Sequence, residues 1–339
     1  MPDRMRIGLA LPHYDFSIPG VSPIRFEALA EVAVRAERLG FDSVWMSDHL
    51  FATLGRYGGG DERYGSLEPL STLAALALLT ERVRLGTLVL SAAFRHPAIV
   101  AKTVTAIDRL SNGRVELGLG AGWFADEYEA FGYGFGSVGE RFELLEETMG
   151  YLDALFGYEP ASFEGHRFAL REAFNHPGPV QEPRPPLLVG GKGGPRLLRL
   201  AARFADGWNT VWRWTPEAYA ERAAAAREAC ERVGRDPATL RLSLGLFTVL
   251  GEDESDLVRR YELMRERLPA GVVEATPLEE LRRDGLVGTP EDVLERLERF
   301  AALGVGELIV GPAPVWFALP DPSMLDLFAE RVLPAAKRL

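Results

Sequence analysis

The sequence contains little that would suit a secreted, membrane-bound or nucleic-acid-binding protein. Its only cysteine, Cys230, has no partner for an internal disulfide. No apolar run reaches the length that spans a membrane, and the start MPDRMRIGLALPHYD lacks the apolar segment of a signal peptide. The net charge is −11, and no basic face balances the acidic residues, which argues against binding to nucleic acid or to anionic membranes. We therefore expect a cytoplasmic protein that acts on a small molecule.

What the sequence does contain is a regular alternation of short β-like runs with amphipathic helix patterns. Such alternation predicts a parallel sheet, and eight strand signals predict a closed (β/α)8 TIM barrel, here one domain over residues 1–339. The expected strands are Arg6–Leu11, Ser43–Met46, Arg84–Leu90, Val115–Leu119, Leu187–Val189, Gly207–Thr210, a strand within Leu240–Leu250, and Glu307–Val310.

Amphipathic stretches between these runs predict the helices. They lie at about Arg25–Leu39, Pro69–Thr80, Pro97–Leu110, Gly139–Phe156, Pro195–Phe204 and Pro216–Val233, with one that opens at Thr289-Pro290 and a last one at about Pro322–Leu333. Two insertions break the rhythm: residues 157–186 after the fourth helix, with a hairpin at Phe163–Leu170, and the charged, partly helical residues 252–285 after the seventh strand. The Gly-rich loop 55–65 is a candidate lid or substrate loop.

A glycine-rich turn, Gly190-Gly191-Lys192-Gly193-Gly194, stands between a predicted strand and a predicted helix. Successive glycines let backbone N–H groups converge, and the helix start adds partial positive charge, so the turn favours a phosphate. The alternative is a tight turn that merely tolerates glycine. A Walker A pattern is absent.

A second glycine cluster, Gly118-Leu-Gly120-Ala121-Gly122-Trp123, follows the fourth strand. Its spacing does not fit the dinucleotide fingerprint, and no acidic residue closes a second strand some twenty residues later. We expect these glycines to bring the backbone close to a flat ligand that Trp123 and Glu127 border, with close strand packing as the alternative.

Asp48 and His49 follow the second strand, where a barrel opens. Histidine is the commonest acid/base side chain, although an isolated Asp-His pair also fits a structural histidine. The five histidines show no metal-ligand spacing, so we expect no metal. The expected substrate pocket contains His13, Trp123, Trp212 and Trp316, since aromatic side chains in a concave mouth suit a planar or apolar ligand. Core packing is the alternative for the tryptophans.

As a set, these segments resemble the bacterial-luciferase-like superfamily of flavin and deazaflavin oxidoreductases. The resemblance covers essentially the whole chain and is carried by RIGLALP, ERLGFDSVWMSDHL, RVRLGTLVLSAAFRHPAIVAKTVTAIDRLSNGRVELGLGAGW, GERFELLEET and PRPPLLVGGKGGPRLLRLAARFADGWN. It is strongest to the branch that uses coenzyme F420, a deazaflavin with carbon in place of the flavin N5, which transfers hydride.

The resemblance implies roles for particular residues. Asp48 and His49 match the Asp-His pair of that branch, in which the histidine is the acid/base and the aspartate orients it or contacts the cofactor. Leu88–Val89 matches its non-proline cis peptide beneath the middle ring. The other cofactor-contacting positions are Ser91, Gly120, Ala121, Gly122 and Glu127, with the phosphate at Gly190, Gly191, Lys192, Gly193 and Gly194.

Two positions depart from the pattern of the branch. Trp123 stands where its sugar-phosphate dehydrogenases carry a catalytic glutamate, which argues against a sugar phosphate as substrate, and Asp126 replaces an asparagine. The resemblance also implies a homodimer.

Three hypotheses remain open on the sequence. The first is an oxidoreductase that transfers hydride between F420 and a small organic substrate, with His49 as acid/base. The second is an FMN-dependent monooxygenase served by a separate reductase. The third is a flavin-binding barrel without turnover. A metal-dependent hydrolase barrel is a more remote alternative.

Overall fold

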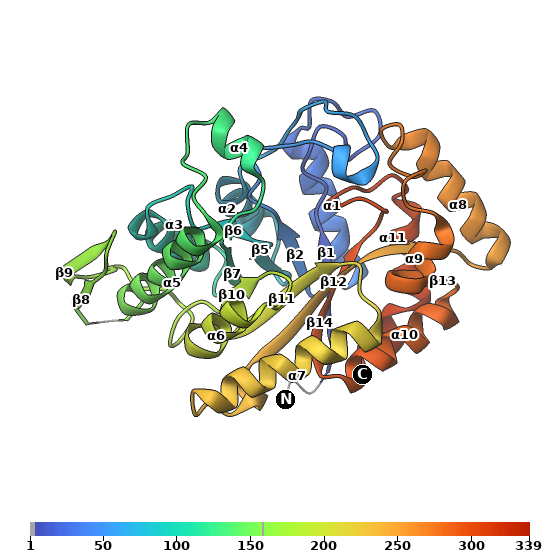
Figure 1. Cartoon of the computed structure of the whole chain (residues 1–339). Coiled ribbons are helices and arrows are strands. Elements are labelled where there is room, and N and C mark those ends of the chain that lie inside the picture. Colours follow the sequence, from blue (N-terminus) through green and yellow to red (C-terminus); the bar gives the residue numbers. More distant parts are fainter. Residues whose placement is uncertain (1–3, 158) are drawn as a thin grey trace.

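The computed structural model describes residues 4–157 and 159–339, and in them eight parallel strands close into a barrel (Figure 1). The sheet runs in the order β10-β11-β12-β14-β1-β2-β5-β7, and pairing of β7 with β10 completes the ring. The predicted (β/α)8 barrel is therefore confirmed. Its strands are β1 (Arg6–Ala10), β2 (Ser43–Met46), β5 (Arg84–Thr87), β7 (Val115–Gly120), β10 (Leu187–Gly190), β11 (Gly207–Trp212), β12 (Arg241–Leu250) and β14 (Val305–Gly311).

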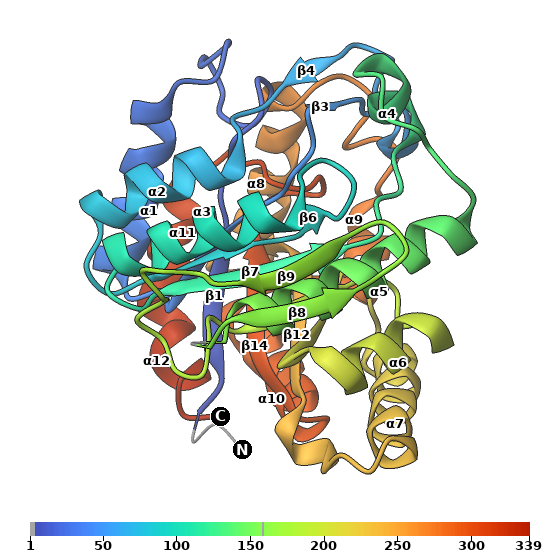
Figure 2. The ribbon, with the colours of Figure 1, turned by 90° about the vertical axis from the view of Figure 1, so that its left-hand side faces the viewer.

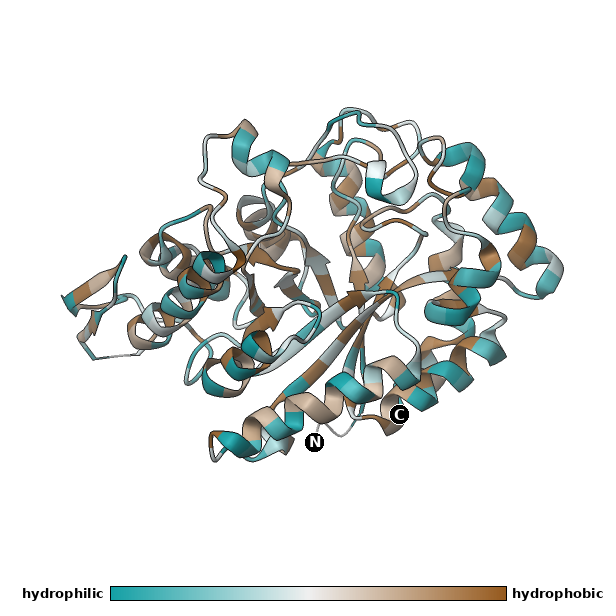
Figure 3. Cartoon of the chain, viewed as in Figure 1, coloured by the Kyte–Doolittle hydropathy of each residue, from teal (hydrophilic) through white to brown (hydrophobic). Residues whose placement is uncertain are grey.

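Helices cover the outside of the barrel, with apolar faces toward the strands and polar faces outward (Figure 3). Several begin with a proline in the first turn. Thr289 is an N-cap, as the sequence predicted, and it also forms a capping box with Asp292. The covering helices are α1 (Phe26–Leu39), α2 (Pro69–Leu79), α3 (Pro97–Leu110), α5 (Val138–Leu155), α6 (Pro195–Phe204), α7 (Pro216–Arg232), α10 (Pro290–Ala302), α11 (Ser323–Arg331) and α12 (Leu333–Ala336). None of the helices in the described ranges is long and apolar enough to cross a membrane.

Shorter elements decorate the two ends of the barrel. The first insertion holds the hairpin β8 (Ala161–Glu164) and β9 (Ala169–Ala173), which starts earlier and ends later than predicted. The second holds α8 (Glu254–Arg267), α9 (Leu278–Asp284) and β13 (Leu286–Gly288), which pairs with β12. The antiparallel pair β3 (Phe51–Ala52) and β4 (Tyr64–Gly65) lies with α4 (Ala125–Ala130) at the end of the molecule opposite the C-terminus (Figure 2).

The third barrel strand is shorter than the predicted Arg84–Leu90. Strand β5 ends at Thr87, the Leu88–Val89 peptide is cis as the resemblance implied, and Leu90–Ser91 forms a separate strand, β6, that pairs with β7. The run LGTLVL gave no local sign of this interruption, because the leucines, threonine and valine around Leu88–Val89 suit a buried strand.

A buried cluster of charges closes the barrel at the end where the strands begin. Glu116, whose side chain is 0% exposed, pairs with Arg6 at 2.7 Å and with Arg84 and Arg241. Arg6 also pairs with Glu307, at 2.8 Å. Burial opposes the charge of Glu116, but attraction to the arginines outweighs it and holds the pKa of the carboxyl well below its usual range.

Candidate active site

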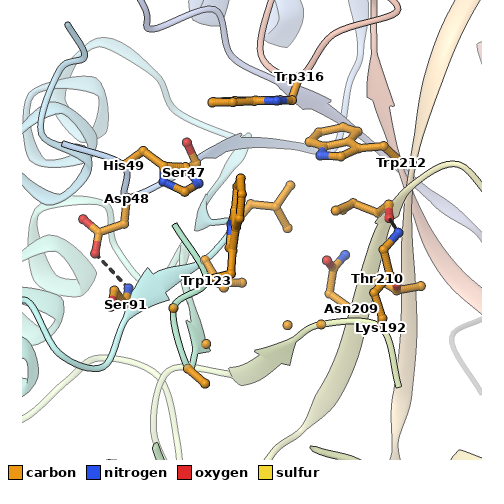
Figure 4. A pocket seen from close by; sticks show the side chains of 18 of the residues that line it. Ser47, Asp48, His49, Ser91, Trp123, Lys192, Asn209, Thr210, Trp212 and Trp316 are labelled. Carbon is orange, nitrogen blue, oxygen red and sulfur yellow. Dashed lines mark hydrogen bonds between the residues drawn. The ribbon is translucent and has the colours of Figure 1, made fainter. Parts of the chain in front are cut away.

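A cavity of about 660 Å³ opens at the opposite end, where the barrel strands finish. It is lined by residues that follow several different strands, which is where barrel enzymes build their active sites. Most of the residues predicted from the sequence reach it: Asp48, His49, Leu88, Val89, Ser91, Gly120, Ala121, Gly122, Trp123, Glu127, Gly190, Gly191, Lys192, Gly194, Trp212 and Trp316. Figure 4 shows His49 and the three tryptophans around this common space.

Two of the predicted residues are absent from the lining. Gly193 is buried in the turn, where an added Cβ would come within 2.8 Å of the Trp208 ring. His13 is 0% exposed and lies behind Ser47, which itself lines the cavity. The prediction of His13 as a substrate-pocket residue is therefore wrong, because its position after a strand did not show which way its side chain points.

His49 is held by a buried carboxylate. Its Nδ1 lies 2.9 Å from Oε1 of Glu127, and the second oxygen of Glu127 accepts from the backbone N–H of Leu50 at 2.9 Å. Because an ionised carboxylate only accepts hydrogen bonds, Nδ1 carries a proton, and Nε2 makes no hydrogen bond to any described residue. Glu127 lines the cavity, and its hydrogen bonds position the imidazole; its contact with the cofactor stays a prediction.

The hydrogen bonds of Asp48 go to Arg95 and to the backbone of Ser91. Its oxygens accept two hydrogen bonds from Arg95, both at 2.7 Å, and one from the backbone N–H of Ser91 at 2.9 Å. None of its hydrogen bonds goes to His49, and within the described residues the hydrogen bond of the His49 ring goes to Glu127. Burial raises the pKa of Asp48, and the Arg95 guanidinium opposes that rise.

Arg95 is a site residue that the sequence analysis missed. It also pairs with Glu68 at 2.6 Å, and burial of its charge is outweighed by the two carboxylates, which raise its pKa. The only signal was a single arginine in the loop SAAFRHP, and nothing local connects it to a carboxylate 47 residues earlier in the chain.

The glycines of β7 and β10 make room for the side chain of Val89. A Cβ added at Gly118, Gly120 or Gly190 would lie 2.7–2.8 Å from a Val89 methyl group. The close-packing alternative therefore accounts for part of the glycine pattern. The same packing places Val89 in the cavity wall, between the ends of two strands.

The turn between β10 and α6 forms one end of the cavity. Gly194 is the N-cap of α6 and offers no side-chain cap, and Pro195 follows at the first helical position. Lys192 lines the cavity, donates to the Val211 carbonyl, and lies 5.1 Å from the Trp214 ring. A helix start with a nearby ammonium group favours an anion.

Aromatic side chains wall the rest of the cavity. Trp212 stacks on Phe247 with ring centres 5.3 Å apart, and Trp316 lies 5.4 Å from the His49 ring. Tyr57, from the predicted lid loop, packs against Trp316, and burial raises its pKa to about 12. The lining also includes residues that the sequence did not indicate, among them Ser47, Arg56, Tyr57, Asn209, Thr210 and Phe247.

The buried His13 should make the protein less stable in acid. Burial lowers its pKa to about 3 from the ordinary 6.5, so between these values the unfolded chain binds a proton that the folded chain does not. Stability is therefore lost as the pH falls below 6.5, by about 1.4 kcal/mol per pH unit, or about 2 kcal/mol between pH 7.5 and pH 5. Urea denaturation at both pH values measures the change in the free energy of unfolding. Between pH 7.5 and pH 5 the His13→Phe variant should lose about 2 kcal/mol less of that free energy than the wild-type protein does. An equal loss in both proteins would contradict it.

A parallel barrel whose cavity is lined by an imidazole, an aromatic wall and an anion-favouring turn has the architecture of a barrel enzyme. The model of the luciferase-like monooxygenase family matches residues 5–307, and the chain belongs to that family.

Curated relatives that match nearly the whole chain include F420-dependent dehydrogenases. An F420-dependent hydroxymycolic acid dehydrogenase of Mycobacterium tuberculosis is 31% identical, covering 98% of this chain and 89% of the relative. An F420-dependent glucose-6-phosphate dehydrogenase of Microbacterium testaceum is 28% identical, covering 91% and 93%. The match therefore runs over about nine-tenths of the length of these enzymes.

Solved structures share the fold. An F420-dependent secondary alcohol dehydrogenase in complex with an F420–acetone adduct superimposes with a TM-score of 0.76 at 23% identity, covering 98% of this chain and 99% of that one. An EDTA monooxygenase from Chelativorans superimposes with a TM-score of 0.79 at 18% identity, covering 98% and 93%. At these identities the likeness establishes the fold alone.

Proposed function

We propose that the protein is an F420-dependent oxidoreductase that transfers hydride between the deazaflavin and a small organic substrate, with His49 as the acid/base. The observation that carries the proposal is the meeting of three groups on one cavity: His49, the Leu88–Val89 segment and the Gly190–Gly194 turn. The F420-dependent relatives, matched along nearly their whole length, support the choice of cofactor.

The residues of the cavity fit a flat molecule with a phosphate tail. Leu88 and Val89 form an apolar segment of the wall, and the glycines packed against Val89 have no room for a Cβ of their own. Gly194 leaves the start of α6 without a side-chain cap, and Lys192 adds positive charge nearby. We assign the ring to the Leu88–Val89 segment and the phosphate to the Gly190–Gly194 turn.

The protein's own contribution is placement and proton handling. When bound, the deazaflavin would supply the hydride chemistry. Glu127 holds Nδ1 of His49, so Nε2 is the nitrogen left to take a proton from a substrate hydroxyl or return one to a carbonyl. The Asp48–Arg95 pair fixes the backbone of Ser91, at the edge of the same cavity. The aromatic side chains of the wall, such as Trp212 and Trp316, would limit the access of water to a bound cofactor and substrate.

Equilibrium binding distinguishes the F420 enzyme from the two flavin alternatives. Titration of the protein with F420 and with FMN, followed by fluorescence or ultrafiltration, should give at least about tenfold tighter binding of F420. Tight FMN binding without affinity for F420 would instead support the monooxygenase with a separate reductase. Binding without oxidation or reduction of any candidate substrate would support the non-catalytic barrel.

A further inference from the structure

Three buried side chains form a hydrogen-bonded chain that ends at the cavity. His13 Nδ1 lies 2.8 Å from the carbonyl oxygen of Leu11, and its Nε2 lies 3.0 Å from Oγ of Ser47. Ser47 Oγ also bonds to the hydroxyl of Tyr14. His13 and Tyr14 are fully buried, whereas Ser47 lines the cavity beside Asp48 and His49 (Figure 4). The proposed reaction does not use this chain.

The direction of every hydrogen bond in the chain is fixed. A carbonyl oxygen only accepts, so Nδ1 of His13 carries the proton. Burial lowers the pKa of His13 to about 3, so the ring is neutral and Nε2 is unprotonated. Ser47 must therefore donate its only proton to Nε2. The Tyr14 hydroxyl must in turn donate to Ser47 Oγ, since Ser47 has no second proton to give.

We propose that Ser47 is a specificity-determining residue that offers the cavity a lone pair and no proton. A bound molecule would then place an O–H or N–H donor against Ser47, and a carbonyl or ether oxygen at that point would face an uncompensated acceptor. His49 lies two residues after Ser47 in the chain, and in its neutral form its Nε2 is a second hydrogen-bond acceptor at the cavity. The inference rests on the proposed function and narrows the substrate class to molecules with a hydrogen-bond donor at this point.

The fixed proton positions can be tested without any ligand. Nitrogen chemical shifts of the histidine rings distinguish protonated from unprotonated nitrogens, and the chain has only five histidines to assign. We expect His13 to be protonated at Nδ1 alone, with no titration down to about pH 5. A proton on Nε2, or a ring that titrates near neutral pH, would overturn the proposal.

A matched pair of probes tests the consequence for binding. Cyclohexanol has a hydrogen-bond donor at its oxygen, and cyclohexanone has none. Each is titrated into the wild-type protein with F420 present, and binding is followed by the chemical shifts of the His49 ring. We expect the alcohol to bind about three- to tenfold more tightly. Ser47→Ala should reduce that preference. His13→Phe removes the acceptor for the Ser47 proton, which frees the hydroxyl to donate into the cavity, and should move the preference toward the ketone.

Two outcomes would contradict the assignment of Ser47. One is a wild-type preference for the ketone, and the other is a His13→Phe variant, folded by circular dichroism, whose preference equals that of the wild type. Failure of the proposed function can be distinguished from failure of the Ser47 assignment. It would appear as absent F420 binding, whereas the ring protonation of His13 would still be measurable in the protein without cofactor.

Discussion

Replacing His49 with alanine is expected to lower turnover by about 10²–10⁴-fold while F420 affinity changes little. The substitution removes the imidazole. Its Nδ1 is bonded to Glu127, so its Nε2 is the nitrogen available for proton transfer in the cavity. Cofactor binding should persist because the assigned ring and phosphate positions, at Leu88–Val89 and Gly190–Gly194, are untouched. Steady-state kinetics of F420 reduction, together with a binding titration, separates the two effects.

His166→Ala is the matched control for this experiment. His166 is exposed in the hairpin of the first insertion and does not line the cavity. Its removal should leave both turnover and F420 affinity unchanged. Turnover by His49→Ala equal to that of the control would refute the acid/base role.

Replacing Glu116 with alanine should lower the free energy of unfolding by about 3 kcal/mol. The substitution removes the shared partner of Arg6, Arg84 and Arg241 and leaves their positive charges close together at the start of the barrel strands. We expect the lower end of the range for a broken buried pair, because each arginine side chain is 19–25% exposed and can turn toward water. Urea denaturation at neutral pH measures the change.

Glu298→Ala provides the comparison. Glu298 is exposed on α10, and its removal should change the free energy of unfolding by less than about 0.5 kcal/mol. If Glu116→Ala were as stable as Glu298→Ala, the charge cluster would not be holding the barrel end together.

The sequence predicted the barrel because its evidence is local and repeated. Each β-like run is short and apolar, each helix pattern is one-sided, and starts such as Thr289-Pro290 are readable from neighbouring residues. The same regularity placed His49, Trp123 and Gly190 after strands. In a barrel, residues that follow strands meet at one end, so their convergence on one cavity was foreseeable.

The pairings within the site could not be foreseen, because they join residues far apart in the chain. Glu127 holds His49 across 78 residues, and Glu116 pairs with Arg6 across 110. Side-chain direction was equally hidden. His13 follows a strand just as His49 does, yet it points into the protein interior, where Ser47 is its partner. Periodicity indicates the face of an element but does not identify the partner of a side chain in a loop.

The most direct test of the account is a crystal structure of the protein with F420. We predict that the deazaflavin ring lies on the Leu88–Val89 segment beside His49 and that its phosphate lies at the Gly190–Gly194 turn. A ring bound away from His49, or a phosphate held elsewhere on the molecule, would contradict the proposal that this one cavity carries the redox chemistry.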